Sequence, residues 1–223
     1  MIPCPFKTPP RWTRRKEARP QELLDAALAL FVERGFSATR LDDVARVAGV
    51  SKGTLYLYYA SKEELFKAVV RENVVPLLGE AEAMIRDHAG SSALLLRQIL
   101  LGWWERIGET RLSGITKLVM AEARNFPELA KFYNEEVILR GNAMLAQVLE
   151  RGVASREFRP LDIAQATSVI AAPIMMMMMW KHSFGSPCAL PTITPQAYLH
   201  GVTDLLLQGL LAHEDRPPAG VIC

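Results

Sequence analysis

Cysteine is scarce in this chain, and Cys4, Cys188 and Cys223 are odd in number and far apart. No Cys-x-x-Cys pair and no cluster of cysteine with histidine occurs. These spacings argue against a disulfide framework and against a structural zinc site. An apolar signal core is also missing at the N-terminus, where prolines are interspersed with charged residues. The expected location is therefore a reducing compartment, the cytoplasm.

Motifs of catalysis are missing as well. The sequence has no glycine-rich phosphate loop, no His-Glu-x-x-His motif and no nucleophile elbow. Its four histidines are scattered, and its many carboxylates fall at helix positions expected to face solvent. We therefore expect no enzymatic activity, no catalytic residue, no metal site and no cofactor.

Strand-like alternation of apolar and polar residues is absent too, which favours an all-α fold. Half of the 223 residues are hydrophobic, enough for a sizeable core. The formal net charge of +2 is unevenly distributed: the segment through Glu72 has thirteen basic and nine acidic residues, a net of +4, which leaves −2 for the rest. A basic head on a mildly acidic body suits a protein that touches DNA with one end.

Three helix starts lie close together between residues 39 and 65. Thr39 with Asp42 predicts a capping box, and helical spacing of apolar residues follows it. Gly49 can adopt positive φ and is expected to end the first of these helices. Ser51 is the expected N-cap of the second helix, and Ser61 that of a third helix, which starts at residue 62. Two short helices joined by a tight turn form a helix-turn-helix, which inserts its second helix into the DNA major groove. A plain helical hairpin with half-buried tyrosines is the alternative.

The order of residues narrows this choice. The segments Gly35-Phe36-Ser37-Ala38-Thr39, Asp43-Val44-Ala45, Ala48-Gly49-Val50-Ser51-Lys52-Gly53-Thr54-Leu55-Tyr56-Leu57-Tyr58-Tyr59 and Ser61-Lys62-Glu63-Glu64-Leu65 closely resemble the DNA-binding domain of the TetR/AcrR family of bacterial transcriptional repressors. The resemblance covers roughly residues 20–66. One departure is Tyr59-Ala60, where the family more often has Phe followed by a polar residue or Gly, and the tyrosine keeps the ring.

This resemblance implies which residues contact DNA. Thr39, Tyr58 and Lys62 are the implied phosphate contacts. The implied groove-facing edge consists of Ser51, Lys52, Gly53, Thr54 and Tyr56, with Thr54 and Tyr56 as the implied base readers.

Four segments are predicted along the chain. Residues 1–19 are expected to be a disordered basic arm, either a solvated tail or an arm that adds DNA contacts. Residues 20–66 form the helix-turn-helix three-helix head, 67–213 a C-terminal helical ligand-binding and dimerisation domain, and 214–223 a tail. Within these, one helix is predicted from Lys62 towards Leu78 with Pro76 inside it or at a kink, and a long helix from Glu128 to about Ala154.

The stretch Ile163–Trp180 carries no charge and approaches the length of a membrane span. Its polar residues and internal proline favour a buried helix instead. If helices 162–180 and 196–212 pair with the same helices of a second chain, both become buried in a four-helix bundle. The resembled family dimerises in this way, and a two-fold dimer presents two recognition helices to a palindromic operator. We therefore predict a homodimer and no membrane segment.

The resemblance also implies a ligand pocket in the body, where a small-molecule inducer releases DNA. The candidate lining residues are aromatic or flexible and polarizable: Trp103, Trp104, Met120, Phe126, Phe132, Tyr133, Met144, Met176 and Trp180. Their alternative role is in the core or the dimer interface. The resulting hypothesis is a dimeric DNA-binding regulator, a repressor released by a small apolar or aromatic ligand. A small-molecule-binding helical protein and a ligand-dependent activator are the alternatives.

Overall fold

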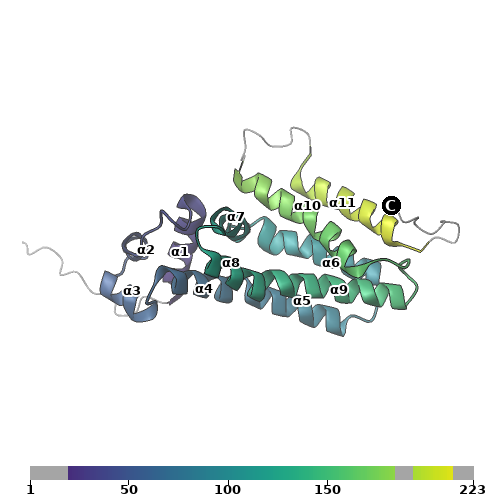
Figure 1. The fold of residues 1–223 in the computed structure, drawn as a ribbon, viewed down its shortest axis with the longest axis horizontal. Helices are drawn as coiled ribbons and strands as arrows, with labels where there is room; N and C mark the ends of the chain where they lie inside the picture. The colour runs from purple at the N-terminus through teal and green to yellow at the C-terminus, as the bar shows by residue number, and fades with distance from the viewer. Residues whose placement is uncertain (1–19, 184–192, 213–223) are drawn as a thin grey trace, which may run out of the picture.

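The computed structural model describes residues 20–183 and 193–212, which form helices joined by short connections, with one isolated β-bridge between Phe158 and Leu211. The molecule is elongated, with a small head at one end and a longer helical body (Figure 1). This confirms the predicted all-α class. The predicted arm at 1–19 and the predicted tail at 214–223 lie outside the described residues.

The head consists of α1 (Pro20–Arg34), α2 (Leu41–Val47), α3 (Lys52–Tyr58) and the beginning of α4 (Lys62–Asn73). Its core is aromatic, since Phe31, Phe36 and Phe66 meet with ring centroids 5.5–5.8 Å apart. Sharp turns bring the short helices onto this core, with positive φ at Gly49, as predicted, and also at Gly35.

The predicted caps of the second and third helix starts are confirmed. The Ser51 hydroxyl accepts the Thr54 backbone N–H at the start of α3, and Ser61 accepts the Glu64 N–H at the start of α4. The predicted capping box at Thr39 is wrong, because α2 begins one residue later, with Arg40 at the N-cap and no side-chain cap.

The predicted helix from Lys62 to Leu78 is two helices. α4 ends at Asn73, and α5 (Val75–Asp87) begins after Val74, with Pro76 in its first turn. Proline has no N–H to continue the α4 ladder, and its ring conflicts with the preceding turn, whereas both properties are tolerated where a helix begins. Pro76 therefore lies at the boundary between α4, which begins in the head, and the first helix of the body.

The rest of the body consists of α6 (Ser92–Trp103), α7 (Ser113–Glu122), α8 (Pro127–Tyr133), α9 (Leu139–Ala154), α10 (Ile163–Ser183) and α11 (Pro195–Leu210). Two π-helical turns interrupt it: η1 (Trp104–Gly108) continues α6, and η2 (Asn134–Ile138) joins α8 to α9. The predicted long helix from Glu128 is therefore three consecutive elements. Each π turn holds an extra residue and changes which side chains face the interior.

α10 and α11 lie along one edge of the body, where α10 packs on α7 and α9 and α11 packs on α6 (Figure 1). By length and composition, α10 is the one helix among the described residues that could cross a membrane. Its end is fixed to the body by Lys181, whose Nζ donates to the carbonyl oxygens of Gly108 and Glu109, both at 2.8 Å. These contacts make α10 an integral helix of the folded body.

Candidate nucleic-acid interface and ligand cavity

The helix predicted to enter the groove, α3, lies at the far end of the head (Figure 1). Leu55 alone anchors it in the core, while Ser51, Lys52, Gly53 and Tyr56 are exposed. A helix held by one buried side chain leaves most of its circumference to solvent. The predicted groove-facing edge is therefore accessible on one short helix.

Polar contacts fix the leading edge of α3. The Ser51 and Thr54 hydroxyls lie 2.8 Å apart, and Lys52 Nζ lies 2.9 Å from an Asp42 carboxylate oxygen on α2. The hydrogen bond and charge of Asp42 raise the pKa of Lys52, which therefore stays cationic at neutral pH. Farther along, the Tyr58 ring is half exposed, and Leu57 is 86% exposed. Leu57 carries no sequence signal for this surface, because its apolar character indicates a core position.

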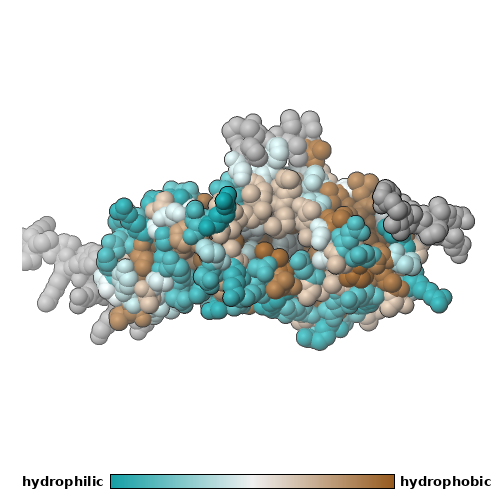
Figure 2. All heavy atoms as spheres, viewed as in Figure 1, coloured by the Kyte–Doolittle hydropathy of each residue, from teal (hydrophilic) through white to brown (hydrophobic). Residues whose placement is uncertain are grey.

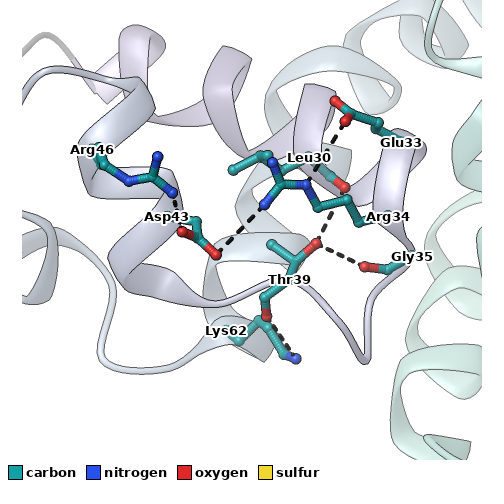
Figure 3. Close-up of polar contacts among 8 residues, drawn as sticks. All are labelled: Leu30, Glu33, Arg34, Gly35, Thr39, Asp43, Arg46 and Lys62. Atoms are coloured by element: carbon teal, nitrogen blue, oxygen red, sulfur yellow. Dashed lines mark hydrogen bonds and ion pairs between the residues drawn. The ribbon is translucent and has the colours of Figure 1, made fainter.

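Thr39, which the resemblance implies to be a phosphate contact, has a buried side chain. The side chain is 1% exposed, and its hydroxyl donates to the carbonyl oxygens of Gly35 at 2.7 Å and Leu30 at 3.2 Å (Figure 3). These bonds join the segment before α2 to the end of α1. Thr39 therefore holds the head together from inside.

Lys62 is also directed inward. Its ammonium donates to the carbonyl oxygens of Phe36, Ser37 and Thr39 at 2.7, 3.2 and 3.1 Å and lies 4.5 Å from the centroid of the Phe36 ring. Burial lowers the pKa of Lys62, against opposing effects of nearby carboxylates. An ammonium has three N–H donors, so this geometry uses all of them. The residue implied as a phosphate contact therefore bonds to the α1–α2 turn in this structure, and its contact with DNA stays a prediction.

A cavity of about 330 Å³ lies in the body. Of the nine predicted ligand residues, Trp103, Tyr133 and Met144 line it. The lining comes from α6, α7, α8, η2, α9 and α10 and includes no charged side chain: Ile99, Leu100, Trp103, Thr116, Tyr133, Val137, Ile138, Gly141, Asn142, Met144, Leu145, Ser168, Ala171, Ala172, Ile174, Met175 and Met178. Eight of these seventeen residues are Ile, Leu, Val or Ala, for which the sequence offers no signal that separates cavity from core.

The other six predicted ligand residues do not line this cavity. Met120 and Met176 point away from it and are more than half exposed, which is the outcome of helical rotation within α7 and α10. Trp104 is buried against Gly108 in the π turn, where a β-carbon on Gly108 would lie 2.1 Å from the indole. Trp180, near the end of α10, is likewise outside the lining.

Phe126 and Phe132 are head contacts. The Phe126 ring meets Phe36 edge-on with centroids 4.8 Å apart, and the Arg71 guanidinium of α4 lies 5.0 Å from the centroid of the Phe132 ring. Arg71 also donates to Glu136 in η2 at 3.0 Å. The body thus contacts the head through the same α8–η2 segment that contributes to the cavity.

A second connection runs through the end of α7. The Glu122 carboxylate accepts the Ser37 backbone N–H and the Ser37 hydroxyl, each at 3.0 Å. Burial by itself raises the pKa of Glu122, but hydrogen bonds from Ser37 and Asn125 and the charge of Lys62 lower it overall. Earlier in α7, a β-carbon on Gly114 would lie 2.5 Å from Val32 of α1, so these helices pack closely.

No group of three or more His, Cys, Asp or Glu residues in the described parts of the chain is placed to hold a metal ion. The candidate sites are therefore the exposed helix α3 in the head and the apolar cavity in the body, and the head and body are in contact through α7 and α8.

Both the head and the body match known protein families. Residues 23–69 match the family described as bacterial regulatory proteins, tetR family, and residues 88–186 match the tetracyclin repressor-like C-terminal domain. The transcriptional repressor KstR2 of Mycolicibacterium smegmatis is 32% identical over 148 residues, which cover 66% of this chain and 71% of that protein. The fatty acid metabolism regulator of Bacillus subtilis is 28% identical over 163 residues, covering 71% and 82%.

Solved structures agree with the fold. FadR of Bacillus subtilis in complex with stearoyl-CoA superposes with a TM-score of 0.72 at 23% identity, covering 86% of this chain and 99% of that one. The ketosteroid transcriptional regulator KstR2 of Mycobacterium tuberculosis superposes with a TM-score of 0.68 at 25% identity, covering 91% and 100%. The head, the body and these relatives together identify the chain as a member of the TetR family of transcriptional regulators.

Proposed function

We propose that this protein is a homodimeric repressor that binds a palindromic operator and is released from it by a small apolar ligand. The observation that supports the proposal is that one chain has an exposed helix, α3, and an apolar cavity, with α7 and α8 contributing to both the cavity and the head contacts. A ligand that fits one arrangement of α7 and α8 better than another shifts the population of head positions.

The dimer surface is the outer edge of α10 and α11. Val169, Met176 and Leu205 are more than half exposed there, and apolar residues gather over this edge in Figure 2. A contiguous apolar patch of this kind indicates an interface, and a two-fold axis would cover it with the same patch of a second chain. The two α3 helices would then face successive half-sites of a palindrome.

DNA contacts are assigned to α3. Thr54 and Tyr56 are the proposed base readers, Ser51, Lys52 and Gly53 the edge that approaches the groove, and Tyr58 a phosphate contact. Tyr58→Phe removes only a hydroxyl and should weaken binding similarly on specific and scrambled DNA. Wild-type affinity in this variant would contradict the phosphate assignment.

Two relatives suggest the kind of ligand. FadR of Bacillus subtilis has been crystallised with stearoyl-CoA, and KstR2 is named a ketosteroid regulator. The cavity of this chain is lined by apolar side chains with a few hydroxyl and amide groups, so we propose an apolar ligand here as well. We also propose a cytoplasmic location, because a regulator of this kind must reach DNA.

The decisive experiment is fluorescence anisotropy of the purified protein with DNA from upstream of its own gene, at two salt concentrations and with scrambled competitor. Binding that survives the competitor, saturates at two chains per site and weakens with salt supports the proposal. Equal binding to scrambled DNA contradicts an operator reader. Absence of binding favours a helical small-molecule-binding protein, and ligand-enhanced binding favours an activator or co-repressed regulator.

Leu205→Glu tests the dimer separately, because it places a charge on the proposed interface. We expect monomers by light scattering and a loss of operator binding. Glu135→Gln, an exposed position on η2 away from α10 and α11, is the control and should leave the dimer intact.

A further inference from the structure

The cavity holds one buried polar pair. Thr116 of α7 and Tyr133 of α8 are each 5% exposed, both line the cavity, and their hydroxyl oxygens lie 3.0 Å apart. The other side chains in the lining that can form hydrogen bonds are less buried than this pair. Asn142 and Ser168 are exposed, and Ser168 donates to the carbonyl of Ala164 in its own helix. Trp103 also carries an indole N–H, but this residue is only partly buried, so the buried polar chemistry of the cavity is concentrated at Thr116 and Tyr133.

Counting protons shows that this pair is not saturated. Each hydroxyl has one proton to donate and can accept, and the mutual bond uses one proton of the two. Neither hydroxyl has another hydrogen-bond partner among the described residues. A buried hydroxyl proton without an acceptor is costly. The pair consequently offers a donor, with acceptor capacity beside it, to a group inside the cavity.

We propose that the Thr116–Tyr133 pair is the polar recognition point of the cavity, and that it binds a carbonyl or hydroxyl oxygen on an otherwise apolar ligand. This inference rests on the proposed ligand-responsive function. The part of the ligand inside the cavity is uncharged, because no charged side chain lines the cavity to compensate a buried charge. The volume of about 330 Å³ is at the small end of small-molecule pockets, so a compact body fits best.

The position of the pair links recognition to the head. Thr116 belongs to the helix that ends at Glu122, which accepts two hydrogen bonds from Ser37. Tyr133 ends the helix that follows Phe126, whose ring packs on Phe36. An oxygen bound by both hydroxyls therefore joins the two helices that contact the α1–α2 turn.

Isothermal titration calorimetry on the full chain tests the pair with two near-isosteric probes, 2-naphthol and 2-methylnaphthalene. We expect wild type to prefer the naphthol. Tyr133→Phe and Thr116→Val should each weaken naphthol binding about tenfold and leave methylnaphthalene within about twofold. Met144→Leu, which changes the lining without a polar atom, is the control and should shift both probes alike.

Equal losses for both probes, a naphthol preference that persists in both variants, or no binding of either probe to wild type would overturn the proposal. Thermal unfolding of each variant confirms that a loss is not caused by unfolding. Titration with 2-decanone and decanoyl-CoA distinguishes a free ketone from a thioester, and Tyr133→Phe must weaken whichever one binds. Because no DNA is present, failure of this test is distinguishable from failure of the operator assay.

Discussion

Lys62→Met tests the most consequential difference between what the sequence implies and what the fold does with it. The substitution keeps an unbranched side chain but removes three N–H donors from the carbonyl oxygens of Phe36, Ser37 and Thr39. A hydrogen bond from a charged donor contributes about 1.5–3 kcal/mol. The net loss is smaller than three such bonds, because burial disfavours the ammonium, as its lowered pKa indicates, and water can reach part of the turn.

We expect a net destabilisation of about 2 kcal/mol, which corresponds to a fall in Tm of about 4–8 °C for a chain of this size. Differential scanning calorimetry measures it. Lys52→Met is the matched control, since this lysine is exposed and its partner Asp42 is also exposed, and little change in Tm is expected.

The dependence of DNA affinity on salt separates the two roles of Lys62. A lysine that contacts a phosphate contributes about 1 to the slope of log affinity against log salt. Below the melting range, Lys62→Met should leave this slope at the wild-type value. An unchanged Tm with a slope reduced by about 1 would refute the anchoring role and restore the phosphate contact.

Three further outcomes are expected. Gly49→Ala should destabilise the head by about 1–2 kcal/mol in thermal unfolding, because φ is +71° although the space around it is open; no change would contradict the assigned turn. Gly114→Ala should cost about 1–3 kcal/mol and change operator affinity in anisotropy, because the new β-carbon meets Val32; wild-type behaviour would show that α7 and α1 are not in close contact. Glu157 accepts hydrogen bonds from the first turn of α6, and these bonds outweigh the effect of burial and lower the pKa of its carboxyl group. Its contribution to the free energy of unfolding should therefore be present above pH 4.5 and lost as the pH falls through the folded-state pKa. The pH dependence of unfolding should lack this contribution in Glu157→Gln.

Local signals determined much of the fold. Ser51 and Ser61 cap their helices because a short hydroxyl side chain satisfies the nearest free N–H whatever surrounds it. Gly35 and Gly49 end helices because few other residues adopt positive φ at low cost. The sequence showed Pro76 but did not settle whether it kinked one helix or began a new one, and the structure places it in the first turn of α5.

The direction of each side chain determines which of the predicted residues lie at the DNA-facing surface and at the cavity. Thr39 and Lys62 have residue types that suit phosphate contacts, yet both turn inward, because the carbonyl oxygens of the α1–α2 turn need donors. The same holds for the cavity, where Trp103 lines it and its neighbour Trp104 does not. Adjacent residues on a helix point about 100° apart, so composition alone cannot rank them.

The sequence by itself determined the all-α class and the short helices of the head, because these depend on caps, turn residues and helical periodicity that act within a few residues. Its resemblance over roughly residues 20–66 indicated the family and the helix expected to enter the groove. Only the tertiary structure decided that α7 and α8 contribute to both the cavity and the head contacts, and that Thr116 and Tyr133 meet across them. Their hydroxyls come from helices whose separation is fixed by packing against α1, α4 and α10, and such long-range contacts leave no local pattern in the chain.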